Sequence, residues 1–471
     1  MRGARPTAGA PHFFRRATRF LAKWENTAKR SPITRGQGVY QAEYAKKLVS
    51  AQQAAARVQD GWTLIHGLTM AEPPAILGAI AQRLREGALQ RLRVYSLLPL
   101  AVAGGTILDP LLCDRVEALT WFVGGGDRGL VDVGLNYFVP NHFHQVPRLI
   151  EEFTDVDVFV TTVSPMDKAG YFSFGTSNDY STTAARRARL TILEVNRHMP
   201  RVFGQSQMHV SEVGLLVENH QPIAPMPHSP NKPEDAVIGQ KVAELIPHEA
   251  TLQLGVGALP NAVADYLGDH KDLGIHTEVL GPGMIKLIKA GVVSGAKKTL
   301  HPRKHVFTVA QGDDEMLAFM DDNPAMESYP VSYVNRPAVI ARNRRMISVN
   351  TVIEVDLTGQ CNAESLAGHQ FSGAGGQLDF VRGAFDAPEG KSILAFRATA
   401  KGGAVSKIVG RLEPGAPVTT PRTDVHWLVT EFGAVNLKGM ATSRRALAII
   451  DLAHPDFRDD LRRQAEDLRL I

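Results

Sequence analysis

From about Tyr40 onward, short apolar runs alternate with segments in which apolar residues recur at helical spacing. Short apolar runs bounded by turn residues are typical of buried strands, and strands that alternate with helices are typical of a parallel α/β sheet. In the first half of the chain the pattern predicts strands at residues 63–66, 92–97, 119–123, 156–163 and 190–195, and helices at residues 44–57 and 74–85.

A proline-rich segment at residues 221–233, with five prolines in thirteen residues, interrupts the alternation and favours an extended connection. We therefore expect a basic, poorly ordered extension at residues 1–37, an N-terminal α/β domain at residues 38–225 and a C-terminal α/β domain at residues 231–471. In the second domain the pattern predicts helices at residues 234–246, 261–267 and 284–290, and strands at residues 251–254, 274–278 and 305–309. The β-branched stretch at residues 338–357, which arginines interrupt, predicts antiparallel strands.

Composition narrows the class of protein. With 44% hydrophobic and 21% charged residues in 471, the chain is typical of a globular protein, and its charge of +4 gives a nucleic-acid role little support. The apolar run at residues 97–108 contains two glycines and is too short to span a bilayer, so we expect no membrane span. Cys113 and Cys361 form no disulfide or zinc motif, which favours a reducing compartment. We expect a cytoplasmic protein, or a mitochondrial or related organellar one if the basic N-terminus is a transit peptide.

One glutamate, Glu278, stands in the apolar-leaning sequence Ile-His-Thr-Glu-Val-Leu, about twenty residues after the loop Gly255-Val256-Gly257. A carboxylate that has lost its hydration can attack an acyl carbon. The glycine loop follows a predicted strand and precedes a predicted helix, so its N–H groups can bind an anion or an oxyanion. A tight turn without a ligand is the alternative, because the third glycine of a dinucleotide fingerprint is missing.

Three further blocks carry candidate chemistry. Gly373, Gly375 and Gly376 let a backbone approach a thin ligand arm closely, or form a flexible turn. Glu431 follows a predicted strand, where α/β sheets place functional side chains, or it is a solvated or cap-forming acid. The block at residues 163–175 lines a pocket or forms a structural hairpin.

In their order along the chain these blocks resemble the acetyl-CoA hydrolase/transferase family, which includes 4-hydroxybutyrate CoA-transferases within the class I CoA-transferases. The resemblance extends from about Gly38 to Asp459 and rests on the blocks at Ser164, Gly255, Glu278, Gly373 and Glu431. It implies two tandem CoA-transferase-type (NagB/RpiA-like) α/β domains with the active site in the cleft between them.

The resemblance also implies a chemistry. Glu278 is then the nucleophile of a ping-pong transfer through a glutamyl-CoA thioester, and Glu431 and Asn335 assist it. The two glycine loops supply the oxyanion and CoA contacts, through Gly255, Val256, Gly257, Gly373, Gly375 and Gly376. The implied substrates are acetyl-CoA or another short-chain acyl-CoA and an acid such as 4-hydroxybutyrate, butyrate or acetate, with no metal, no permanently bound cofactor and a homodimeric assembly.

Asn436 and Lys438 depart from the Ala-Asp-Leu-Arg-Gly sequence of many family members, which puts the choice of substrate in doubt more than the reaction class. Hydrolysis of a short-chain acyl-CoA is the alternative activity. An inactive CoA-sensing protein on the same fold would have lost the nucleophile, which is present here. A nicotinamide-dependent oxidoreductase is disfavoured, because no strand–GxGxxG–helix unit occurs.

Overall fold

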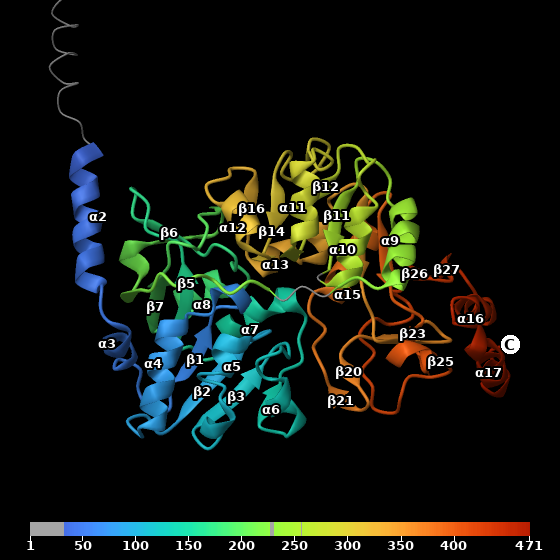
Figure 1. Cartoon of the computed structure of the whole chain (residues 1–471), viewed down its shortest axis with the longest axis horizontal. Helices are drawn as coiled ribbons and strands as arrows, with labels where there is room; N and C mark the ends of the chain where they lie inside the picture. Colours follow the sequence, from blue (N-terminus) through green and yellow to red (C-terminus); the bar gives the residue numbers. More distant parts are fainter. Residues whose placement is uncertain (1–32, 227–229, 256) are drawn as a thin grey trace, which may run out of the picture.

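Two large sheets, one in each half of the chain, form the framework of the protein (Figure 1). The computed structural model describes residues 33–226, 230–255 and 257–471. The first sheet has the strand order β10-β7-β5-β1-β2-β3-β4 and is parallel throughout. The second has the order β12-β11-β17-β22-β26-β27, in which β26 and β27 alone pair antiparallel. The predicted α/β fold is confirmed.

The strands of the first sheet are β1 (Thr63–His66), β2 (Leu92–Ser96), β3 (Val116–Thr120), β4 (Asn136–Phe138), β5 (Val158–Val163), β7 (Leu190–Val195) and β10 (Leu215–Glu218). Those of the second are β11 (Thr251–Leu254), β12 (Gly274–Ile275), β17 (Met346–Asn350), β22 (Lys391–Ala395), β26 (Trp427–Thr430) and β27 (Gly433–Asn436). The principal helices are α2 (Ile33–Lys47), α3 (Ala51–Ala55), α4 (Pro74–Arg85), α7 (Val146–Glu152), α8 (Ser181–Arg187), α9 (Pro233–Leu245), α10 (Ala258–Asp265), α11 (Pro282–Lys289), α12 (Asp314–Met320), α15 (Gln377–Asp386), α16 (Thr442–Asp451) and α17 (Pro455–Asp467).

The strand order of both sheets reverses at an inner strand. In the first sheet the chain extends from β1 toward β2 on one side and toward β5 on the other. In the second sheet β11 lies between β12 and β17 in the same way. Loops at the carboxyl ends of strands diverge at such a switch point and leave a crevice there, which is where open α/β sheets bind ligands.

The predictions for β1, β7, β11 and α4 agree with the structure residue for residue. The strand predicted at residues 119–123 instead spans Val116–Thr120, because its burial alternates and the apolar run continues past the strand as a loop. The helix predicted at residues 44–57 is two helices, α2 and α3. Ser50 and Gln53 form a capping box that starts α3 anew.

The prediction of antiparallel strands over residues 338–357 is wrong for most of the segment. β17 is a parallel strand in the middle of the second sheet, between β11 and β22. Arg344 and Arg345, two of the arginines that interrupt the β-branched pattern, lie in the turn before it, and both bind Glu389. β18 (Glu354–Asp356) does have one antiparallel partner, β19 (Cys361–Asn362).

The two halves are also joined directly. β8 (Phe203–Gly204) of the first half pairs with β16 (Met326–Ser328) of the second, beside β14 (His305–Phe307). Val309 and Val331 belong to the same apolar cluster as the core residues under the first sheet. The division into domains at residues 225 and 231 stays a prediction, as does the poorly ordered extension at residues 1–37. Residues 1–32 lie outside the described residues, and α2 begins at Ile33. No helix in the described part of the chain is long and apolar enough to cross a membrane.

The contact between α9 and α10 is close enough to require glycine. A Cβ atom on Gly239 of α9 would lie 2.8 Å from the carbonyl oxygen of Ala262 in α10, so backbone would have to move. We expect Gly239→Ala to destabilise the protein by about 1–3 kcal/mol. The matched change Gly78→Ala in α4, where a Cβ meets nothing within 4 Å, should stabilise it by up to about 1 kcal/mol. Urea unfolding of the two variants checks the pair, and a loss of stability from both would contradict this account.

Candidate active site

Glu278 lies at the switch point of the second sheet. It follows β12, next to the carboxyl end of β11, and precedes the short strand β13 (Val279–Leu280). A cavity of about 300 Å³ opens there. From the second half it is lined by Glu278, Gly255 and the glycine-rich block at residues 373–376, and from the first half by Phe122. The structure thus brings residues of both halves of the chain together around one cavity.

Two donors hold the carboxylate of Glu278. The side-chain amide of Asn335 donates to Oε2 of Glu278 at 2.5 Å, and the backbone N–H of Gly376 also donates to this carboxylate. Asn335 is fully buried at the C-terminus of the one-turn helix α13 (Val331–Val334). Gly376 is the N-terminal cap of α15, and a Cβ there would overlap both the Glu278 carboxylate and the Asn335 amide. Glycine at position 376 is therefore required by the close approach of the Glu278 carboxylate and the Asn335 amide.

Burial raises the pKa of Glu278 to about 7. This pKa is the net result of burial, the largest cause, and the nearby charge of Asp379, which raise it, and of the hydrogen bonds from Asn335 and Gly376, which lower it. A carboxylate with this balance is poorly solvated yet substantially ionised near neutral pH. Such a balance is characteristic of a functional acid or nucleophile.

The first half of the chain supports the glycine-rich block from the opposite side. His144 Nδ1 lies 2.7 Å from Oδ1 of Asp379, and the N–H of Phe143 donates to the carbonyl oxygen of Gly375 at 3.0 Å. A Cβ on Gly373 would lie 3.0 Å from the ring of Phe122. The sequence analysis missed these first-half residues. The two histidines at positions 142 and 144 were a visible signal, but no spacing pointed to a partner 235 residues away.

The loop at residues 255–257 reaches the cavity at Gly255, and the oxyanion and CoA contacts expected of the loop stay a prediction. Gly255 lines the cavity, but its N–H donates to the carbonyl oxygen of Val349 in β17 at 3.1 Å. Val256 lies outside the described residues. Gly257 caps α10 at a φ of 114° and is exposed. Among the described residues, Asn335 and Gly376 are the donors to Glu278.

Glu431 and the block at residues 163–175, the remaining candidates, form hydrogen bonds to backbone groups. The Glu431 carboxylate, between β26 and β27, accepts the N–H of Ala398 at 2.9 Å, and Glu431 is not among the residues that line the Glu278 cavity. Its part in the reaction stays a prediction. In the block at residues 163–175, Asp167 accepts the N–H groups of Ala169 and Tyr171 and closes a turn, which supports the hairpin interpretation.

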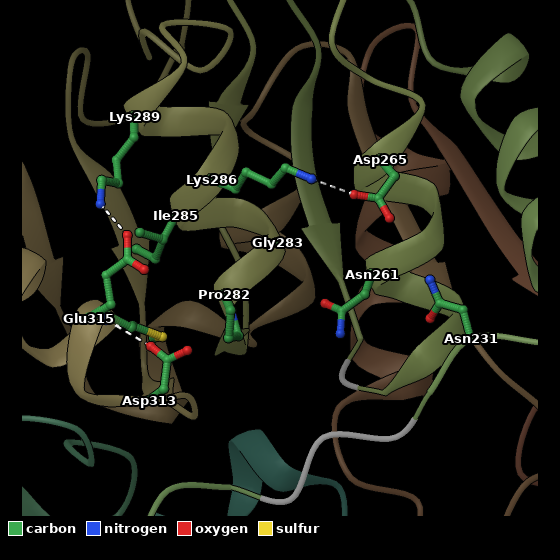
Figure 2. A pocket seen from close by; sticks show the side chains of 11 residues that line it. Asn231, Asn261, Asp265, Pro282, Gly283, Ile285, Lys286, Lys289, Asp313 and Glu315 are labelled. Atoms are coloured by element: carbon green, nitrogen blue, oxygen red, sulfur yellow. Dashed lines mark hydrogen bonds and ion pairs between the residues drawn. The ribbon is translucent and has the colours of Figure 1, made fainter.

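A separate cavity of about 460 Å³ lies between α10, α11 and α12 (Figure 2). Its charged groups are mostly paired with one another. Lys286 binds Asp265 at 2.8 Å, and Lys289 binds Glu315. This pairing leaves little net charge to attract an ionic ligand. In the described part of the chain, no group of three His, Cys, Asp or Glu side chains is arranged to hold a metal ion.

Comparison with known proteins covers nearly the whole chain. The model of the acetyl-CoA hydrolase/transferase N-terminal domain matches residues 34–227, and that of the C-terminal domain matches residues 312–465. A succinyl-CoA:cyclohexane-1-carboxylate CoA transferase from Geobacter metallireducens is 39% identical over 92% of this chain and 98% of its own length. A 4-hydroxybutyrate coenzyme A transferase from Clostridium kluyveri is 41% identical over 89% of this chain and 97% of its own length. The crystal structure of RipA from Yersinia pestis is 48% identical, covers 92% of this chain and all of its own, and superposes with a TM-score of 0.89.

The raised pKa of Glu278 makes a prediction about stability. Between its ordinary pKa of 4.5 and its folded value of about 7, the folded protein binds more protons than the unfolded chain, so this residue makes the protein less stable as pH rises. Glutamine cannot ionise, yet its side-chain oxygen can still accept from Asn335 and Gly376. We expect Glu278→Gln to melt at a higher temperature than the wild type above pH 7, with a difference that shrinks as pH falls toward 4.5. A difference independent of pH in thermal scans would contradict the shift.

Proposed function

The chain belongs to the acetyl-CoA hydrolase/transferase family, and we propose that it transfers coenzyme A from a short-chain acyl-CoA, such as acetyl-CoA, to a short carboxylate. 4-Hydroxybutyrate, butyrate and acetate are the acceptors we propose first, with coenzyme A as a substrate and not as a resident cofactor. The observation that carries this proposal is Glu278, a carboxylate with a raised pKa that two hydrogen-bond donors hold in a cavity between the halves.

The proposed reaction begins when the Glu278 carboxylate attacks the thioester carbonyl. The C–S bond breaks, CoA leaves as a thiolate, and a mixed anhydride joins Glu278 to the acyl group. The thiolate then attacks the side-chain carbonyl carbon of Glu278, the donor acid leaves as a carboxylate, and a glutamyl-CoA thioester remains. An acceptor carboxylate attacks this thioester, and the same two steps in reverse release the new acyl-CoA and free Glu278.

The two donors on Glu278 suit this chemistry. Each attack on the side-chain carbon of Glu278 places negative charge on its oxygen. Asn335 and Gly376 already donate to the Glu278 carboxylate in the resting protein, so little reorganisation is needed when that charge develops. Loss of one preorganised oxyanion donor typically costs about 100-fold to 1,000-fold in rate. We therefore propose that Asn335 and Gly376 form the oxyanion site for the attacks on Glu278.

The surroundings of the cavity support coenzyme A as the substrate. A second cavity of about 490 Å³ shares Val352, Ile353 and Phe371 with the Glu278 cavity. Four basic side chains line it together with two acidic ones: Lys232, Arg397, Lys401 and Lys407, with Glu354 and Glu413. A narrow reactive cavity beside a basic one matches a molecule with a thin pantetheine arm and a phosphorylated nucleotide head.

We further propose that the enzyme acts in the cytoplasm as a homodimer. The cysteines support a reducing compartment, because Cys113 and Cys361 are both free. The dimer rests on the family resemblance alone, and light scattering of the purified protein tests it.

Replacing the nucleophile should abolish transfer. We expect Glu278→Gln and Glu278→Ala to lose at least about 1,000-fold in kcat while remaining folded, because one side chain carries the covalent step. Borohydride treatment of the wild type with acyl-CoA should reduce the thioester, and peptide mapping should locate the change at Glu278. A label on another residue, or an active Glu278→Ala variant, would refute the assignment. Consumption of acyl-CoA without any acceptor would identify a hydrolase instead.

The basic cavity makes a separate prediction. Lys401 is exposed, and Lys401→Glu should raise the KM for acyl-CoA by about tenfold, because it sets an acid against the phosphates. The KM for the corresponding acyl-pantetheine, which lacks the nucleotide, should stay the same. Lys46→Glu on α2, also exposed, is the matched control and should change neither value. Equal effects of Lys401→Glu on both donors would show that this cavity does not bind the nucleotide.

A further inference from the structure

His276, two residues before the nucleophile, is fully buried and bound to backbone. Its Nε2 lies 2.8 Å from the carbonyl oxygen of Val334. A carbonyl oxygen can only accept, so Nε2 must carry the hydrogen. Burial lowers the pKa of His276 to about 3, and the charges of Lys298 and His301 lower it as well, so the ring is neutral at working pH. His276 is therefore a fixed N–H donor and takes no part in proton transfer.

His276 binds Val334, and the next residue, Asn335, binds Glu278. Val334 is the last residue of α13, and Asn335 is its C-terminal cap. A helix of four residues has little stability of its own, so its position depends on contacts from outside. His276 supplies one such contact through Val334, and Glu278 is bound by the very next side chain.

The backbone from His276 to Glu278 explains how one segment contacts both Val334 and Asn335. His276 bridges to Val306 in parallel, and the N–H of Thr277 donates to the carbonyl oxygen of Val306. The chain bends at Glu278, and both side chains reach the same helix end, His276 at the Val334 carbonyl oxygen and Glu278 at the Asn335 amide. His276 and Glu278 both face the end of α13.

We infer that His276 is a positioning residue, which fixes the Val334 carbonyl so that the Asn335 amide is aimed at the Glu278 carboxylate. The inference rests on the proposed role of Glu278 as nucleophile. Without this hydrogen bond, the end of α13 shifts and Asn335 donates less well, both to the resting carboxylate and to the oxyanion that forms from it.

His276→Phe is the direct test, because it keeps an aromatic ring beside Phe380 and removes the donor. We expect kcat to fall by about 10-fold to 100-fold, since small misplacements at a reacting centre have effects of this size, with the KM for acyl-CoA within about twofold. The acidic limb of the kcat/KM profile should move to higher pH, because the hydrogen bond from Asn335 lowers the pKa of Glu278. The N–H of Gly376 and the charge of Asp379, which also act on Glu278, remain in place in this variant.

His270 offers a matched control. Its Nε2 lies 2.9 Å from the carbonyl oxygen of Ile246, and its Nδ1, like that of His276, has no hydrogen-bond partner among the described residues. It does not line the Glu278 cavity. His270→Phe should leave both kcat and the pH profile as in the wild type. His276→Gln can place an amide N–H toward Val334, and it should recover most of the activity that His276→Phe loses.

The double variant His276→Phe/Asn335→Ala decides between positioning and general disruption. If His276 acts through Asn335, the double variant should be no slower than Asn335→Ala alone, and both should share one acidic limb. The inference would be overturned if the double variant lost the product of the two single-variant losses in kcat. An acidic limb that stays at the wild-type pH in His276→Phe would also overturn it. If the phenylalanine variant does not fold, a folded His276→Gln variant with the pH profile of Asn335→Ala would overturn it too. Activity of Glu278→Gln would instead overturn the proposed function, so the two failures are distinguishable.

Discussion

The hydrogen bonds that Asn335 and Gly376 donate to Glu278 are the interaction around which the site is organised. A carboxylate withdrawn from water is unstable as an anion unless donors replace its hydration. Here the donors are the C-terminal cap of a one-turn helix and the N-terminal cap of α15, so two helix ends converge on one side chain. Burial and the charge of Asp379 oppose them, and the net effect is a carboxyl group whose pKa is raised to about 7.

The same constraint explains why both halves of the chain are needed. Gly376 can approach Glu278 only while the glycine-rich block is held in place, and the block is held from the first half by Phe143 and His144. The cavity is accordingly closed by residues of both halves, with a basic cavity beside it. The proposed covalent chemistry at Glu278 and the proposed recognition of an anionic head group therefore use adjoining cavities.

The pattern of apolar residues along the chain predicted those strands in which nearly every residue is buried. β1, β5, β7 and β11 are buried on nearly every residue, and their apolar runs mark them directly. The pattern failed at β17, where charged side chains in the preceding turn, such as Arg345, masked a central strand. The polar groups there are satisfied by Glu249 and Glu389, which are distant in sequence, so no local rule could have placed them.

By itself the sequence determined the α/β class, the order of the motifs, the family and the candidate nucleophile, because each depends on residue type and local spacing. Only the tertiary structure decided which groups act on Glu278. It placed Asn335 and Gly376 on the carboxylate, committed the N–H of Gly255 to β17 and bound Glu431 to Ala398. It also placed His276 against the carbonyl oxygen of Val334 and His144 against the carboxylate of Asp379. Hydrogen bonds of this kind join segments tens to hundreds of residues apart, and their geometry exists only once both sheets have formed.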